Sequence, residues 1–124
     1  FESVEIVESH HPEKVDAPSG TARFTAQKVA AARQGHAPSP DATDPQDMGA
    51  RGTSVDGVPI HSVRLRGLVA HQEVVFGSIG ETLTITHDSL NRDSFMQGVL
   101  IAIKEIDHID GVVVGLENVL PLGS

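Results

Sequence analysis

The chain has 124 residues, a formal net charge of −8 and no cysteine. Its length allows one modest core, and its negative charge argues against binding to nucleic acid or to an anionic membrane surface. The absence of thiols excludes disulfides, thiolate metal sites and a cysteine nucleophile. No apolar run has the roughly 18 residues that a membrane-spanning helix needs, and no signal-peptide pattern opens the chain. A strand pattern begins almost at the first residue, Phe1, so we expect a fragment of a longer protein.

The first predicted elements are a strand followed by a helix. Ser3–Ser9 has Val4 and Ile6 on one side, as an amphipathic strand requires. Ala22–Arg33 is rich in alanine and lacks proline and glycine, which favours a helix. Small hydroxylated residues just before it are typical helix caps, and Gly35 is a plausible stop. The apolar stripe of this helix predicts that it packs one face onto a sheet.

The middle of the chain is a long connection followed by three strand patterns. His36–Gly57 is rich in proline, glycine and aspartate, and such a long connection is either disordered or an arm ordered against another subunit. The strands are predicted at Val58–Arg66, Leu68–Phe76 and Glu81–Asp88, with a hairpin turn at Gly77–Gly80. In the last strand Leu83 and Ile85 alternate with threonines, a pattern typical of an antiparallel sheet with unlike faces.

The C-terminal part is predicted to be a helix over Ser94–Asp107 and a short final strand within Val112–Leu122. The helix is apolar over most of its circumference, which indicates burial on more than one side. A domain this small offers few ways to bury it, so the pattern predicts a partner surface that these residues do not supply.

A polar cluster, ESHHPEKVDAPSGTA over Glu8–Ala22, lies on the connection between the first strand and the first helix. A histidine such as His10 or His11 can give or take a proton near neutral pH, and Lys14 is a compact cation. Gly20–Thr21 stands at the helix start, where free N–H groups and the helix dipole favour an anion. The cluster therefore predicts a basin for a carboxylate or phosphate substrate.

Other interpretations of this region stay open. A histidine pair on a loop is often solvent-exposed and without a functional role, and Ser-Gly-Thr at a helix start often serves only as a helix cap. A metal site is a further alternative, since four residues are potential ligands, namely Glu8, His10, His11 and Asp16. Adjacent strand residues diverge and Lys14 would repel a metal ion, which argues against that site. His61 and His71 are interpreted as sheet histidines and as candidate cross-strand neighbours. Arg64 and Arg66 are candidates to bridge carboxylates at an interface, although exposed ion pairs of this kind carry little information on function.

The same cluster carries a family resemblance. Glu8–Ala22 meets every fixed position of the pattern E-x-H-H-x-x-K-x-D-x-P-S-G-T-A, which resembles the signature of the 4-hydroxy-tetrahydrodipicolinate reductase (dihydrodipicolinate reductase) family. The similarity continues through Val63–Phe95 and covers nearly the whole chain. The segment ARGTSVDG over Ala50–Gly57 resembles the corresponding segment of actinobacterial members of the family.

The resemblance implies an enzyme of lysine (diaminopimelate) biosynthesis that reduces a cyclic dicarboxylate with hydride from NADH or NADPH. On the matching positions it implies His10 as the proton donor and acceptor, and Lys14 as a second proton donor. It implies that three residues bind substrate, namely His11, Gly20 and Thr21. It also implies cofactor contacts at Arg92 and Phe95.

Family members begin with a Rossmann domain whose glycine-rich fingerprint is absent from this sequence. We therefore expect residues 1–91 to be a substrate-binding, catalytic and oligomerisation domain. Residues 92–124 would be a C-terminal helix and tail that pack on the nucleotide-binding domain. Without that domain, the isolated chain is expected to be inactive.

Pattern and resemblance together predict an α+β fold, with a mixed, largely antiparallel sheet of about four strands and helices packed on one face. The resemblance also implies a cytoplasmic homotetramer that binds a small dicarboxylate but neither nucleic acid nor membrane. The alternative is a non-catalytic module that binds dicarboxylates and assembles subunits without performing chemistry.

Overall fold

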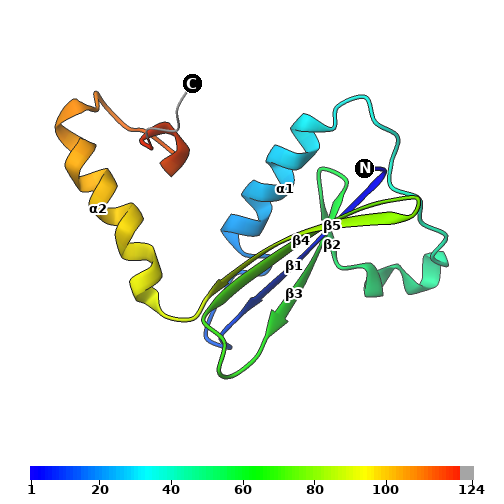
Figure 1. The fold of residues 1–124 in the computed structure, drawn as a ribbon. Coiled ribbons are helices and arrows are strands. Elements are labelled where there is room, and N and C mark those ends of the chain that lie inside the picture. The colour runs from blue at the N-terminus through cyan, green and yellow to red at the C-terminus, as the bar shows by residue number, and fades with distance from the viewer. Residues whose placement is uncertain (121–124) are drawn as a thin grey trace. The chain divides into compact units, whose positions relative to one another are not determined.

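The protein is described by a computed structural model that covers residues 1–120 (Figure 1). The chain separates into two compact units, Phe1–Ser89 and Leu90–Ser124, which we call the sheet unit and the C-terminal unit. In the part of the chain that the structure describes, no helix is both long and apolar enough to cross a membrane.

The sheet unit is built on five strands in the order β2-β3-β1-β4-β5. Their bounds are β1 Ser3–His10, β2 Thr53–Val55, β3 Val58–Arg64, β4 Ala70–Ser78 and β5 Glu81–Ser89. The central strand β1 runs parallel to β3, and every other pair is antiparallel. The predicted mixed, largely antiparallel sheet is therefore confirmed, with five strands where about four were expected.

Helix α1, Gly20–Ala32, packs on one face of this sheet. The side chain of Ser19 caps it by accepting a hydrogen bond from the N–H of Ala22 at 3.2 Å. Its small buried residues, Ala22 and Ala26, allow close contact with the strands. The buried hydrophobic cluster consists of these two alanines with Val4, Ile6, Val58, Ile60 and Val74.

The long connection is ordered on the sheet of its own chain, so the interpretation as a disordered segment is wrong. It contains the 3₁₀ helix η1, Pro45–Arg51, and the strand β2 that pairs with β3. Gly52 joins the two with a φ of 72°, and a Cβ at this position would come within 2.3 Å of the carbonyl oxygen of Ile60. Only glycine fits this close approach.

Strand β5 exposes side chains on both of its faces within the sheet unit. Leu83 and Ile85 face the same side as α1 but remain 45% and 57% exposed. The expected pairing of His61 with His71 is wrong, because β1 lies between their strands. His61 is the register partner of Val7 on β1, while His71 partners another β1 residue and Asp88 of β5.

The C-terminal unit is helical in its described residues. Its elements are η2 Arg92–Phe95, α2 Met96–Glu105, η3 Ile106–His108 and η4 Leu116–Asn118. The predicted helix over 94–107 is thus present in shorter pieces, and several of its apolar side chains are exposed, namely Val99, Leu100, Ile103 and Ile106. The final strand expected within 112–122 is wrong for residues up to 120, where Gly115 has a positive φ and the 3₁₀ helix η4 follows it. Residues 121–122 lie outside the described part.

Candidate active site

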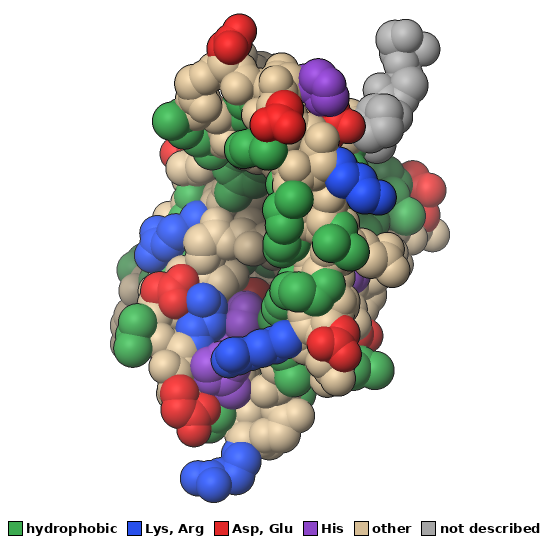
Figure 2. Space-filling view, turned by 90° about the vertical axis from the view of Figure 1, so that its left-hand side faces the viewer, with side chains coloured by type: hydrophobic (Ala, Val, Ile, Leu, Met, Phe, Trp, Pro, Cys, Tyr) green, Lys and Arg blue, Asp and Glu red, His purple; other side chains and the backbone are tan. Residues whose placement is uncertain are grey.

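The candidate site is the connection between β1 and α1. Strand β1 ends at His10 and α1 begins at Gly20, so residues 11–19 form the loop. The end of the sheet where β1 stops faces the viewer in Figure 2, where histidine, carboxylate and lysine or arginine side chains gather. Successive β1 side chains alternate between faces. Glu8 and His10 therefore follow Val4 and Ile6 on the face that packs against α1.

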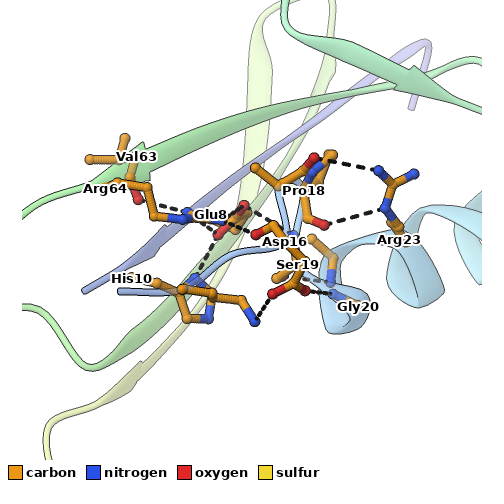
Figure 3. Close-up of polar contacts among 12 residues, drawn as sticks. Glu8, His10, Asp16, Pro18, Ser19, Gly20, Arg23, Val63 and Arg64 are labelled. Carbon is orange, nitrogen blue, oxygen red and sulfur yellow. Dashed lines mark hydrogen bonds and ion pairs between the residues drawn. The ribbon is translucent and has the colours of Figure 1, made fainter. Parts of the chain in front are cut away.

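Glu8 is the centre of this site and is fully buried. Arg64 of β3 donates to both of its carboxylate oxygens, at 2.9 and 3.0 Å. The backbone N–H of Ser19, at the start of α1, donates to the same carboxylate at 3.1 Å. The Nδ1 atom of His10 lies 2.6 Å from Oε2 (Figure 3). One carboxylate thus joins two strands, the helix start and the candidate proton donor.

The Glu8 carboxylate is held in its charged form. Burial would raise the pKa of Glu8, but hydrogen bonds from Arg64, Ser62, His10 and Ser19 outweigh that effect and lower it. An ionised carboxylate only accepts hydrogen bonds, so the proton of the short contact must lie on Nδ1 of His10. The other ring nitrogen, Nε2, takes no part in the contact with Glu8.

Lys14, Asp16 and Gly20 form a second group in the same loop. The ammonium of Lys14 lies 2.7 Å from Oδ1 of Asp16, and the N–H of Gly20 donates to Oδ2 at 3.2 Å. The hydrogen bond from Lys14 lowers the pKa of Asp16, and the backbone N–H of Gly20 adds to that effect. A carboxylate therefore already bridges two of the groups that the sequence assigned to an anionic substrate.

The two groups are physically linked. The guanidinium of Arg64 donates to the backbone carbonyl oxygen of Asp16 at 2.7 Å, as well as to Glu8. Figure 3 shows Glu8, Asp16 and the helix start around Ser19 and Gly20 converging beside His10. The loop that carries Lys14 is therefore fixed to the carboxylate that holds His10.

The remaining candidate residues take no part in the hydrogen bonds to Glu8 or Asp16 described above. His11 pairs with Glu13 at 3.2 Å rather than with Glu8. Thr21 is an exposed residue in the first turn of α1. Arg92 and Phe95 belong to η2 in the C-terminal unit.

The chemistry of the donor set does not favour a metal ion. Glu8 is saturated by donors, and within residues 1–120 no group of three histidine, cysteine or carboxylate side chains could hold one. The described residues also do not fit the pyrophosphate of a dinucleotide. The connection from β1 into α1 has a single glycine, Gly20, and therefore lacks the glycine-rich turn that lets a backbone approach a pyrophosphate. The glycines of the β4–β5 turn do not open a helix.

Sequence reasoning missed two residues of this site. Arg64 was considered only as a bridge to carboxylates at an interface, and Glu8 was given no role other than that of a potential metal ligand. The signal for both lies in tertiary pairing: β1 and β3 are parallel, and the register places His10 beside Arg64. The alternation of β1 did indicate a buried carboxylate, because Glu8 follows Val4 and Ile6 on the core face. A buried carboxylate requires a cation as its partner.

Comparisons with known proteins identify the family of this chain. Residues 1–120 match the family model described as dihydrodipicolinate reductase, C-terminus. The chain is 62% identical over 122 residues to the 4-hydroxy-tetrahydrodipicolinate reductase of Mycolicibacterium smegmatis, a match that covers 98% of this chain and 50% of that protein. It is 60% identical, with the same coverage, to the reductase of Mycolicibacterium gilvum.

Among solved structures, the chain is similar to a dipicolinate-bound dihydrodipicolinate reductase from Paenisporosarcina sp. TG-14. The TM-score is 0.81 and the identity 52%, over 97% of this chain and 45% of that one. The chain thus spans about half the length of the curated relatives that it matches. It belongs to the dihydrodipicolinate reductase family, in the part that forms the C-terminal domain.

Proposed function

We propose that this chain is the substrate-binding and proton-donating part of a reductase in lysine (diaminopimelate) biosynthesis. Its substrate would be a dihydrodipicolinate-type cyclic dicarboxylate, and its product tetrahydrodipicolinate. The observation that carries the proposal is the bridge formed by Asp16, whose carboxylate spans Lys14 and the N–H of Gly20. A site that holds a carboxylate of its own chain has the donors to hold a carboxylate of a substrate.

The substrate dianion would replace Asp16 in this bridge. One carboxylate would then contact Lys14 and the start of α1 at Gly20 and Thr21, with His11 as a further contact. Substrate binding of this kind needs no rearrangement of the backbone, because the N–H of Gly20 already points to a carboxylate oxygen. The ring of the substrate would lie near His10, which Glu8 holds from the opposite side.

Reduction adds a hydride and a proton across a double bond of the substrate. NADH or NADPH would supply the hydride from a nucleotide-binding domain that the described residues do not include. His10 would donate the proton from Nε2 as the electron pair of the broken double bond accumulates on the substrate. Lys14 would stabilise that negative charge and act as a second proton donor. Hydride gained, proton gained and double bond lost together balance the reduction.

The rest of the chain would serve assembly. We assign residues 1–91 to substrate binding, catalysis and oligomerisation, and residues 92–124 to packing on the nucleotide-binding domain, with Arg92 and Phe95 contacting the cofactor. The exposed apolar side chains of α2, such as Leu100 and Ile103, support a covered surface there. The resemblance further supports a homotetramer in the cytoplasm. The alternative is an assembly module that binds dicarboxylates without catalysis.

The test uses a fusion protein, in which this chain replaces the C-terminal half of the Mycolicibacterium smegmatis relative. We expect His10→Gln and Lys14→Ala each to lower kcat by about 10²–10⁴-fold, the usual contribution of a positioned proton donor. His61→Gln is the matched control, because His61 also contacts a carboxylate at 2.6 Å but is the register partner of Val7, on the face of the sheet opposite Glu8 and His10. Its kcat should stay within about twofold.

Either of two results would decide against the reductase assignment. Unchanged kcat in the His10 and Lys14 variants would remove their catalytic roles. A fusion protein that binds dipicolinate but shows no dihydrodipicolinate-dependent oxidation of NADH or NADPH would favour the assembly module.

A further inference from the structure

We infer that Glu8 and Arg64 are positioning residues for His10, which they hold with Nδ1–H toward the buried carboxylate and Nε2 toward the substrate. The inference rests on the proposed function and extends it to two residues that would not contact the substrate. It is carried by the geometry of one buried carboxylate on which Arg64 of β3, the N–H of Ser19 and the His10 ring converge.

The first step is that Glu8 can only accept hydrogen bonds. Oε1 receives the N–H of Ser19 and one guanidinium nitrogen of Arg64. Oε2 receives the other guanidinium nitrogen and lies 2.6 Å from Nδ1 of His10. Both guanidinium nitrogens of Arg64 and the N–H of Ser19 stabilise the ionised form of this fully buried carboxylate, so the proton of the contact with His10 lies on the ring and not on Glu8. His10 is therefore held in one tautomer, with the proton on Nδ1.

The second step is that the carboxylate itself cannot turn. Arg64 forms a bidentate hydrogen-bonded pair with it. The guanidinium also donates to the backbone carbonyl oxygens of Asp16 and Val63, at 2.7 and 2.8 Å. The N–H of Ser19 fixes the same carboxylate from the start of α1. Because two strands, the loop and the helix start all meet on Glu8, the orientation of the His10 ring is set by the fold.

The third step is chemical. In the imidazolium form of His10, the proton on Nε2 is the one available to the substrate, while Glu8 stabilises the positive charge through Nδ1–H. When the Nε2 proton leaves for the substrate, the neutral ring keeps its Nδ1 proton and regains a lone pair on Nε2. That lone pair can accept a proton from water for the next turnover. Without the carboxylate, the ring could turn or change tautomer and present the wrong nitrogen.

The isosteric variant Glu8→Gln tests this directly. In this variant Arg64 and the N–H of Ser19 should donate to the amide oxygen. The amide NH₂ would then face His10, and as a donor it would need Nδ1 without a proton as its acceptor. We expect ¹⁵N NMR of the chain, well above the usual histidine pKa of about 6.5, to show the Nδ1–H tautomer for His10 in the parent and the Nε2–H tautomer in Glu8→Gln. In the fusion protein we expect kcat to fall by about 100-fold or more, with KM for the dicarboxylate within about threefold.

Glu5→Gln is the matched control, since Glu5 contacts His61 and Arg51 in the same manner on the other face of β1. It should change neither the tautomer of His10 nor kcat. The parent measurement alone decides the inference if Glu8→Gln does not fold: an Nε2–H tautomer for neutral His10 in the parent overturns it. Unchanged kcat in a folded Glu8→Gln variant also overturns it. If His10→Gln loses activity in that case, the reductase proposal stands and only the positioning role falls.

Discussion

Strand β1 carries two clusters that look alike. In the site cluster, Glu8 binds Arg64 through both oxygens and lies 2.6 Å from His10. In the loop cluster, Glu5 contacts Arg51 through both oxygens and lies 2.6 Å from His61. The two carboxylates are three residues apart, so the alternation of the strand places them on opposite faces of the sheet.

What differs is the surroundings. The Glu8 side chain is fully buried, whereas that of Glu5 is 34% exposed. The site cluster adjoins a helix start and the Lys14–Asp16 pair, both suited to an anion. The loop cluster instead joins β1 to β3 and to the long connection, through Arg51 and Asp41. A carboxylate–histidine contact alone therefore does not indicate a catalytic site. The role proposed for the site cluster depends also on the groups suited to an anion beside it, namely Lys14 and the start of α1.

The largest contrast should come from removing each arginine. Arg64→Leu leaves the buried Glu8 charge without its cation, and breaking a buried pair in this way costs about 3–5 kcal/mol of unfolding free energy. Arg51→Leu leaves a carboxylate that water can reach, so its cost should be about 1 kcal/mol or less. Urea unfolding of the two variants measures the difference. Equal losses would contradict the distinction between a buried and a solvated cluster.

A smaller contrast concerns the two aspartates. Asp16→Asn removes the carboxylate that competes with substrate for Lys14 and Gly20, so dipicolinate should bind more tightly, by up to about fivefold, the worth of one exposed ion pair. Asp41→Asn, which loosens only the loop cluster, should leave the affinity unchanged. Calorimetric titration of both variants checks this. Weaker binding by Asp16→Asn would mean that Asp16 positions Lys14 instead of competing for it.

The smallest effect is the response to acid. Arg51 and His61 lower the pKa of Glu5 against the opposing effect of burial, and the donors around Glu8 do the same there. Because both folded pKa values lie below the ordinary 4.5, the unfolded chain binds more protons below that pH. The stability they contribute is present above about pH 4.5 and is lost as pH falls through the lowered values. Thr43 and Arg51 lower the pKa of Asp41 from 3.8 to about 2, so its share is lost as the pH falls toward about 2.

Thermal unfolding from about pH 6 to about pH 2 follows this loss. Tm should decline below about pH 4.5, and Glu5→Gln or Glu8→Gln should each flatten the decline. Asp41→Asn should flatten only its most acidic part. A Tm that rises toward acid would contradict the assignment of these carboxylates.

Much of the fold could be predicted from local pattern. Val4 and Ile6 on alternate positions indicated the buried face of β1, and Ser19 before an alanine-rich run indicated the cap and start of α1. The long connection could not be predicted, because its order depends on the pairing of β2 with β3 and on a close approach at Gly52. Composition rich in proline and glycine carries no information on such tertiary contacts.

The candidate site divides in the same way. His10, Lys14 and Gly20 lie within one loop, so their proximity follows from sequence spacing. Arg64 reaches the site only through the parallel pairing of β1 with β3. A parallel pair needs a crossover rather than a hairpin, and no local turn signal marks it. Residues that act through such a pair are invisible until the sheet order is known.

The measurement that tests the central claim most directly is an NMR titration of this chain with pyridine-2,6-dicarboxylate, following the imidazole signals of all seven histidines. If the β1–α1 loop is a dicarboxylate site, His10 and His11 should shift with saturation, while His61 of the loop cluster should not. Lys14→Ala should abolish those shifts. Signals of His10 and His11 that stay unmoved at millimolar ligand, or shifts spread equally over all seven histidines, would contradict the account.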